Sequence, residues 1–300
     1  MSQAKHSINL AIAGCLLGTI STFSAVLRDN GISSFQQSFS RTFFALLFIL
    51  VIFFIRKINF LIPRKEIPYY TILGMIMAAV GFFENSAVAL GTPVAVVVLF
   101  LYTQPAWTAL LGKILFQEQL TWVRRTAVIT AFCGIILISE VWSVSSFNFA
   151  GGAIALAAGI LLSVEFIMIK SLSLKPRHFL VSIFWFYVFR SLFTVGFGFL
   201  SRAVTHDTLI TGFSFSVSVE TGILLVLFAL IPMVVGMGIF YRSVKYVPIV
   251  HAGVIMMMEA ISGVIYGYLV LGEAINTFTI FGGVLILLAS ALTILEKRSD

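Results

Sequence analysis

Five ionisable side chains lie deep within long apolar stretches of this 300-residue sequence: Arg41, Glu84, Glu165, Arg190 and Glu259. A charge at the centre of a membrane helix costs about 2.5–3.5 kcal/mol on insertion scales, so such residues face a protein interior or a watery cavity. Three carboxylates face two guanidinium groups, which leaves one glutamate without an obvious basic partner. Such a glutamate suits either uptake and release of a proton or binding of an ammonium group.

Depth along the expected helices suggests which of these charges are partners. Arg41 and Glu84 lie at similar depths, so we expect them to pair in the outer half of the membrane. Arg190 and Glu259 both fall near the middle, and Glu165 lies nearer the cytoplasmic end. Arg–Glu pairs that only fix helix packing are the structural alternative. Glu165 and Glu259 are the candidates for coupling to an ion and for contact with a ligand.

Aromatic and polar side chains share helix faces with these charges. Met256, Glu259, Gly263 and Tyr266 follow helical spacing and form one stripe. A carboxylate beside Trp or Tyr binds ammonium groups through Coulomb and cation–π interactions, although most membrane aromatics face lipid or pack the core. The candidate substrate-binding residues are Glu84, Tyr102, Gln104, Trp107, Glu165, Trp185, Arg190, Glu259 and Tyr266.

The elements that must position these residues are membrane-spanning helices. The chain is 60% hydrophobic and 10% charged, with a mean hydropathy of +1.08, whereas soluble domains carry about 25% charged residues. Its apolar runs are continuous rather than alternating, which favours helices over barrel strands. The sequence therefore predicts an all-α polytopic membrane protein with ten transmembrane helices, at 7–27, 35–55, 69–91, 93–116, 122–140, 150–170, 179–203, 219–242, 247–272 and 276–295.

The distribution of basic residues predicts the orientation of these helices. Fifteen of the 19 Lys and Arg residues fall on one side of the membrane, against Arg28 and Arg202 on the other. Cytoplasmic loops carry such an excess. We therefore expect a multi-pass protein of the inner (cytoplasmic) membrane with both termini in the cytoplasm. Because topology explains the net charge of +7, we expect no nucleic-acid partner.

The sequence also contains an internal repeat. Positions 155 apart carry the same residue in three pairs: Pro93 and Pro248, Gly112 and Gly267, and Glu118 and Glu273. Arg41 and Arg190 correspond at an offset of 149. The chain thus divides into two five-helix halves, 1–148 and 149–300. Five is odd, so the second half is expected to be inverted, as in alternating-access carriers. Both repeated glutamates lie in helix-end turns and are interpreted as structural.

These segments resemble the EamA-type family of the drug/metabolite transporter superfamily, whose members have two five-helix repeats. The resemblance rests on SRTFFALLFIL in the second span, on the segment from ENSAVALG to CGIILI, and on the segment from YRSVKYVP to LLASAL. Family members usually have a proline in the middle of both the fourth and the ninth span. This chain has Pro105 but Ala260, so we expect the kink in the first half alone.

The resemblance implies a secondary active transporter of a small metabolite that works by alternating access, with export of an amino acid or related compound favoured. Import of an amine, quaternary ammonium or nucleoside-like metabolite is the alternative, and a lipid-headgroup flippase is an alternative of another class. The sequence shows no phosphate loop, metal-spaced His/Cys cluster or nucleophile–base pattern. We therefore expect no enzyme activity, metal or cofactor. The expected partners are a small-molecule substrate, a proton or counter-metabolite, and the lipid bilayer, for a monomer or a homodimer.

Overall fold

The computed structural model describes residues 3–144 and 148–296, and all regular structure in these ranges is helical. Nine of the described helical segments are long and apolar enough to cross a membrane. The α-helices are α1 (Gln3–Leu17), α2 (Thr19–Asp29), α3 (Ser34–Arg56), α4 (Ile67–Ala89), α5 (Val94–Leu101), α6 (Gln104–Leu115), α7 (Trp122–Ser139), α8 (Phe149–Ser173), α9 (Phe179–Val204), α10 (Thr208–Thr211), α11 (Val219–Phe228), α12 (Met237–Ser243), α13 (Ile249–Met256), α14 (Met258–Tyr266) and α15 (Thr277–Leu295). Short 3₁₀ segments are η1 (Arg64–Glu66), η2 (Val141–Ser143) and η4 (Val244–Tyr246), and π-helical segments are η3 (Ala229–Gly236) and η5 (Gly267–Leu271).

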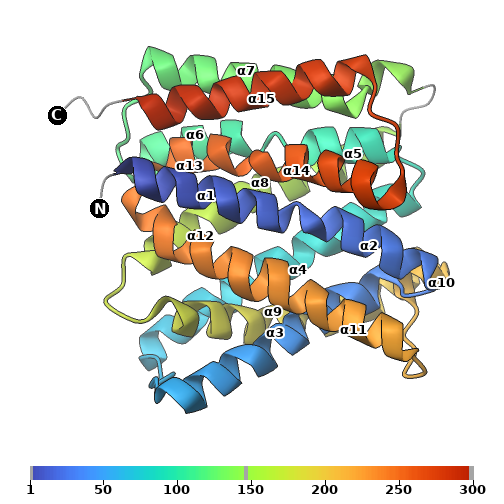
Figure 1. Ribbon diagram of the computed structural model, residues 1–300. Helices are drawn as coiled ribbons and strands as arrows, with labels where there is room; N and C mark the ends of the chain where they lie inside the picture. The colour runs from blue at the N-terminus through green and yellow to red at the C-terminus, as the bar shows by residue number, and fades with distance from the viewer. Residues whose placement is uncertain (1–2, 145–147, 297–300) are drawn as a thin grey trace.

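The predicted fourth span, 93–116, is divided into two helices. α5 ends at Leu101 and α6 begins at Gln104, and Figure 1 shows them end to end. Pro105 has no N–H to donate to the Leu101 carbonyl, which interrupts the helical hydrogen-bond ladder. Neither piece approaches the roughly 20 residues that a spanning helix needs. The described residues therefore hold nine candidate spans, where the sequence predicts ten.

The ninth predicted span is broken as well, so the expectation of a kink in the first half alone is wrong. α13 ends at Met256 and α14 begins at Met258. The residue between them, Met257, is the C-cap of α13 and lies 155 positions after Tyr102, the C-cap of α5. At this break the Ala260 N–H donates to the Met257 carbonyl (3.0 Å), which is a tightened i to i−3 turn. The break therefore forms without a proline, because the turn itself satisfies the backbone groups.

The turns after these two broken helices have the same backbone geometry. The Glu118 N–H donates to the Gly112 carbonyl, and the Glu273 N–H donates to the Gly267 carbonyl. The N···O distance is 3.3 Å in both hydrogen bonds. The same hydrogen bond thus recurs at the offset that the sequence repeat predicts. The two halves share local structure here and not only residue types.

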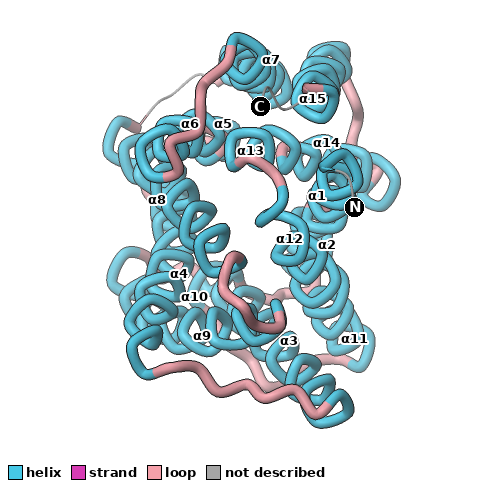
Figure 2. The backbone as a smooth tube through the Cα atoms, turned by 90° about the vertical axis from the view of Figure 1, so that its left-hand side faces the viewer, coloured by secondary structure: helices cyan, strands magenta, loops and turns pink. Residues whose placement is uncertain are grey.

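The helices form two groups in the end-on view of Figure 2. α7 and α15 pack along their lengths and run in opposite directions (Figure 1). Their backbones approach so closely that a Cβ atom at Gly134 would lie 2.7 Å from the Gly282 carbonyl oxygen. Glycine permits such close approach of two helices. The other long helices form a ring, in which α9 packs against α3 and α4, α8 against α4, and α13 against α1 and α6.

The bundle has two ends, which we name from the chain. The termini face is the end where α1 begins and α15 ends, and the far face is the end that holds α10 (Figure 1). Large apolar side chains such as Phe54 and Leu269 remain exposed along the bundle, at 77% and 68%. Such exposure is expected of a surface that meets lipid rather than water.

Candidate functional site

The five interior charges of the sequence come from five different helices and interact with one another. The Arg41 charge, on α3, interacts with those of Arg190 on α9 and Glu84 on α4. The Glu259 charge, on α14, interacts with those of Glu165 on α8 and Arg41. Glu165 interacts in turn with Arg190. The fold therefore brings together one group of charges, which we call the interior charge group.

No member of the interior charge group forms an ion pair within 4.0 Å among the described residues. The predicted Arg41–Glu84 pair is therefore not formed as a close contact. α9 packs against both α3 and α4, so the Glu84 charge interacts with Arg190 as well as with Arg41. Arg190 and Glu165 are 5% and 7% exposed, and the Arg41 Nε is buried without a hydrogen-bond partner. Buried charges without partners are costly, so this arrangement suits groups that bind a ligand.

Close contacts fix the position of Arg190. A Cβ atom at Gly74 on α4 would lie 2.6 Å from the Arg190 backbone nitrogen and 2.5 Å from the Phe189 Cβ, so α4 and α9 meet where only glycine fits. The next residue, Ser191, donates a hydrogen bond to the Thr42 hydroxyl (3.0 Å). Thr42 and Ser191 are 149 positions apart and follow the two arginines. This bond thus ties α3 to α9 beside both guanidinium groups.

Glu259 is positioned by a similar close approach. α1 and α2 meet at Gly18, where a Cβ atom would lie 2.6 Å from the Glu259 carbonyl oxygen and 2.1 Å from the Ser262 hydroxyl. The Ser262 hydroxyl also donates to the Met258 carbonyl (2.8 Å). The α1–α2 junction therefore packs directly on the turn of α14 that carries the carboxylate.

The break between α5 and α6 places one aromatic candidate near these charges. Tyr102 interacts electrostatically with both Glu259 and Glu84. Gln104 and Trp107 instead use their side-chain donors within the same chain segment, on Thr108 (2.9 Å) and Thr103 (3.1 Å). Tyr102 thus joins the interior charge group, whereas the other two stabilise the broken helix.

Two candidates have other neighbours. The Trp185 indole donates to the carbonyl of Phe60 (2.8 Å), in the loop between α3 and η1, and its ring lies against Phe189. Tyr266 interacts with Cys15 on α1. The contacts of the described residues therefore bring neither aromatic residue to the interior charge group.

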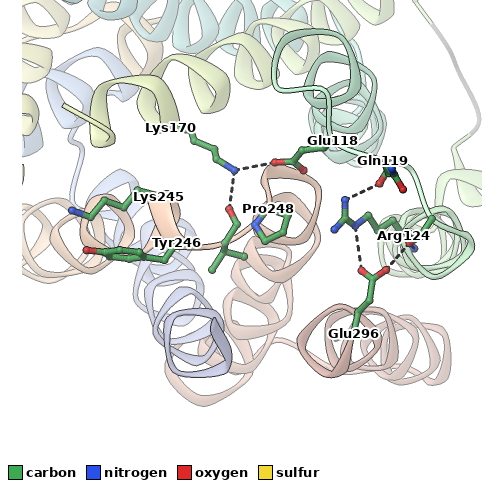
Figure 3. A pocket seen from close by; sticks show the side chains of 10 residues that line it. Glu118, Gln119, Arg124, Lys170, Lys245, Tyr246, Pro248 and Glu296 are labelled. Atoms are coloured by element: carbon green, nitrogen blue, oxygen red, sulfur yellow. Dashed lines mark hydrogen bonds and ion pairs between the residues drawn. The ribbon is translucent and has the colours of Figure 1, made fainter. Parts of the chain in front are cut away.

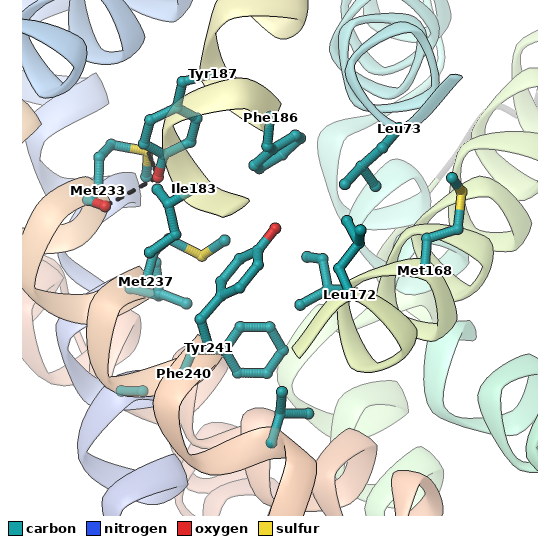
Figure 4. Close-up of a cluster of buried hydrophobic side chains, with 14 of the residues drawn as sticks. Leu73, Met168, Leu172, Ile183, Phe186, Tyr187, Met233, Met237, Phe240 and Tyr241 are labelled. Atoms are coloured by element: carbon teal, nitrogen blue, oxygen red, sulfur yellow. Dashed lines mark hydrogen bonds between the residues drawn. The ribbon is translucent and has the colours of Figure 1, made fainter. Parts of the chain in front are cut away.

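Two tyrosines that the sequence analysis does not select lie beside the charges. The Tyr187 hydroxyl donates to the Met233 carbonyl (2.9 Å) in the π-helical segment η3, as Figure 4 shows. The Tyr241 hydroxyl points toward Phe186 in Figure 4 and is buried with no hydrogen-bond partner among the described residues. Its charge neighbours include Glu165. The available signal was the i, i+3 spacing of Tyr187 and Arg190 on one helix face, and π-helical turns are frequent at functional sites.

A second polar region lies at the termini face, where a pocket of about 460 Å³ opens (Figure 3). Four of the charged side chains in its walls form ion pairs, Lys170 with Glu118 (3.0 Å) and Arg124 with Glu296 (3.2 Å). Within residues 3–144 and 148–296, no group of three or more His, Cys, Asp or Glu side chains is arranged to hold a metal ion. Charged side chains therefore define both polar regions.

Comparisons with known proteins agree with this architecture. A solved structure described as "Crystal structure of protein" superposes with a TM-score of 0.79, at 15% identity, over 98% of this chain and 99% of that one. At that identity the likeness shows the fold alone. A search of curated proteins gives no match. The model of the EamA-like transporter family matches twice, over residues 6–140 and 149–295. The chain therefore belongs to the EamA-like transporter family, whose two-repeat architecture it shares, and it is a membrane transporter of small solutes.

Proposed function

We propose that this protein is a secondary active transporter of a zwitterionic metabolite, an amino acid or a close relative, with export as the favoured direction. The observation that carries the proposal is a set of buried guanidinium and carboxylate groups, represented by Arg190 and Glu165, that form no ion pair with any residue described by the structure. A zwitterion supplies a carboxylate for the arginine and an ammonium group for the glutamate, in charge-assisted hydrogen bonds. One substrate thus satisfies both signs of charge.

We propose further that α5 and α6 together form the fourth of ten spans, so that 1–148 and 149–300 are inverted repeats. The antiparallel course of α7 and α15 and the recurring turn at Glu118 and Glu273 support this arrangement. Inverted repeats rock against each other around a site near the midplane. The excess of basic residues on one side supports a location in the cytoplasmic membrane with both termini in the cytoplasm.

The surplus carboxylate supplies a means of energy coupling. Three glutamates and two arginines make up the interior charge group, so one glutamate is free to carry a proton while the others bind substrate. Glu165 and Glu259 interact with each other, so ionisation of one disfavours ionisation of the other. We therefore assign proton coupling to this pair.

The test is transport into proteoliposomes under an imposed pH gradient. The panel contains an apolar amino acid, the amine and the carboxylic acid that share its side chain, and a nucleoside. We expect the amino acid to be transported at least tenfold faster than either single-charge analogue, about the effect of one lost charged hydrogen bond. Equal transport of the amine would overturn the zwitterion assignment in favour of amine import. Movement of a labelled lipid headgroup, with no transport of the panel, would favour a flippase.

A further inference from the structure

Ion pairs join the two halves of the chain at one end of the bundle. Three such pairs occur among the described residues, and all lie at the termini face: Lys170 with Glu118, Arg124 with Glu296, and Arg177 with Glu66. In each pair one residue belongs to 1–148 and the other to 149–300. The ends of the halves are therefore held together by charge on this side.

Glu118 is the centre of the first contact (Figure 3). Its Oε1 atom accepts from the Lys170 ammonium (3.0 Å) and from the Ile249 backbone N–H (2.7 Å), at the start of α13. The Lys170 ammonium also donates to the Val247 carbonyl (2.8 Å). A carboxylate at a helix N-terminus is stabilised by the unpaired N–H groups and the helix dipole. The side chains of this ion pair are 9% and 13% exposed, so solvent screens the pair little.

Glu296 forms the second contact, at the end of α15. One carboxylate oxygen accepts from the Thr121 hydroxyl that caps α7 (2.6 Å), and the other accepts from the Arg124 guanidinium (3.2 Å) and contacts the His251 ring. Three groups, two from α7 and one from α13, thus converge on one carboxylate at the end of α15.

The far face has carboxylates that correspond to Glu118 and Glu296, but neither of them forms an ion pair with a described residue. Glu140 accepts a hydrogen bond from Asn276, the cap of α15, as Glu296 does from the cap of α7. The Glu273 carboxylate lies against Gly267 of its own chain segment. The position 155 after Arg124 is Thr279. Between the described residues, no ion pair joins the halves at this face.

Exposure inside the bundle follows the same asymmetry. Glu84 lies near the far end of α4 and is an exposed residue. The next residue, Asn85, lines a small pocket together with Arg190, so this turn of α4 borders the interior charge group. Thr108, on the helix that leads to the termini face, is 0% exposed.

We propose, on the basis of the alternating access proposed above, that Glu118, Lys170, Arg124 and Glu296, which line the pocket at the termini face, form a latch. The latch closes the route from this pocket to the interior charge group, none of whose residues lines the pocket, so that the resting transporter is open to the far face. Because the members of each pair belong to different halves and lie at one end of the bundle, opening of the termini face must separate them. The latch residues are positioning residues, since they set which side reaches the substrate without contacting it.

Side-specific cysteine labelling tests the latch without any substrate. The background carries Cys15→Ser and Cys133→Ser, and single reporters are Thr108→Cys for the termini side and Asn85→Cys for the far side. With the latch intact, a membrane-impermeant maleimide reaches Asn85→Cys from the far face, while Thr108→Cys is protected from the termini face. Adding Glu118→Gln should raise labelling of Thr108→Cys from the termini face by about tenfold and lower that of Asn85→Cys.

Glu273→Gln is the matched control, because it removes the repeat-related carboxylate that has no cation. It should change both labelling rates by less than about twofold. Equal effects of the two substitutions, or no effect of Glu118→Gln, would overturn the latch. Failure of every substrate in the transport panel would sink the proposed function and leave this labelling result intact.

Lys170→Met covers the case in which Glu118→Gln does not fold, because it should raise labelling of Thr108→Cys from the termini face as well. Where both single variants fold, a double variant tests whether the two residues act together. Lys170→Met leaves the Glu118 carboxylate at the start of α13, and the double substitution Glu118→Gln/Lys170→Met removes both charges at once. If the two residues act through their ion pair, the labelling change of the double variant is smaller than the sum of the two single changes. Strict additivity would show that they act separately and would overturn the proposal.

Discussion

The interior charge group and the latch both contain buried charged side chains, yet only those of the latch form ion pairs among the described residues. At the termini face, Glu118 holds the Lys170 ammonium at 3.0 Å and caps a helix as well. In the interior, Arg190 and Glu165 are equally buried and have no ion-pair partner among the described residues. Similar residues in similar burial therefore serve different ends.

The two sets of charges differ in what neutralises them: other residues of the protein in the latch, and a proton or a ligand in the interior charge group. A buried ion pair that is satisfied within the protein fixes one conformation, and removing one partner is destabilising. A buried charge that the fold leaves incomplete must be completed by a proton or a ligand. In the proposed mechanism, the latch therefore controls the conformational cycle and the interior charge group binds the substrate.

The largest effect is expected from Glu118→Ala. This change leaves the Lys170 ammonium buried without its carboxylate, which costs about 3 kcal/mol. Thermal unfolding in detergent should show a lower midpoint for this variant. Glu273→Ala, which leaves no cation behind, is the comparison and should unfold near the midpoint of the unsubstituted protein. If both variants were equally unstable, pairing would not distinguish the two ends.

Glu165→Gln should affect transport and not stability. Loss of one charged hydrogen bond to the substrate weakens transport by about 30-fold, or about 2 kcal/mol. The unfolding midpoint should stay the same or rise, because a costly buried charge is removed. Initial rates in proteoliposomes and unfolding in detergent, measured on one preparation, check both parts. A fall in stability without a change in transport would assign this glutamate to packing.

Gly74→Ala tests whether the interior charges need exact placement by their helices. The added methyl group would meet the Arg190 backbone at 2.6 Å, so α9 must shift, at a cost of about 1–3 kcal/mol. Gly81→Ala on the same helix meets nothing within 4 Å and serves as the control. We expect slower transport and a lower unfolding midpoint for the first variant alone. Unchanged transport in Gly74→Ala would show that Arg190 tolerates displacement.

The smallest effect concerns the pH dependence of the latch. Burial alone raises the pKa of the Glu296 carboxyl, but hydrogen bonds from Thr121 and His251 and the charge of Arg124 lower it below its ordinary value of 4.5. A folded-state pKa below the unfolded one means that the ionised group stabilises the fold above pH 4.5 and that this stabilisation is lost as the pH falls through the lowered pKa.

The measurement is the difference in unfolding midpoint between the unsubstituted protein and Glu296→Gln. We expect a difference of a few degrees at pH 7 that shrinks below pH 4.5. A difference that grew on acidification would contradict the direction of the pKa shift. Glu140→Gln, at the equivalent position of the far face, should show little difference at either pH.

Much of the fold follows from the sequence, because the physics of lipid acts on composition. Continuous apolar runs predict spanning helices, and the cost of a buried charge predicts that Arg41 and Glu259 face inward. The break at Met257 does not follow, since no proline marks it and its turn is satisfied by local hydrogen bonds. A residue pattern that lacks a breaker does not exclude a broken helix.

The site is predicted less completely, because depth along a helix does not tell which helices are neighbours. Arg41 and Glu84 lie at similar depth, but their helices, α3 and α4, each pack against α9. The two side chains form no ion pair among the described residues. Lys170 appears in the sequence as a loop residue at the end of a span, yet it is 7% exposed. Only the packed structure shows its partner Glu118.

The hydrogen bond between Thr42 and Ser191 has a geometrical consequence. The two residues occupy equivalent positions of the repeats, and equivalent points touch only on the axis that relates the repeats. When the two halves exchange conformations, residues away from the axis move relative to the other half. Residues on the axis keep their contacts. We therefore expect this hydrogen bond to persist on both sides of the cycle, as a pivot between the two arginines.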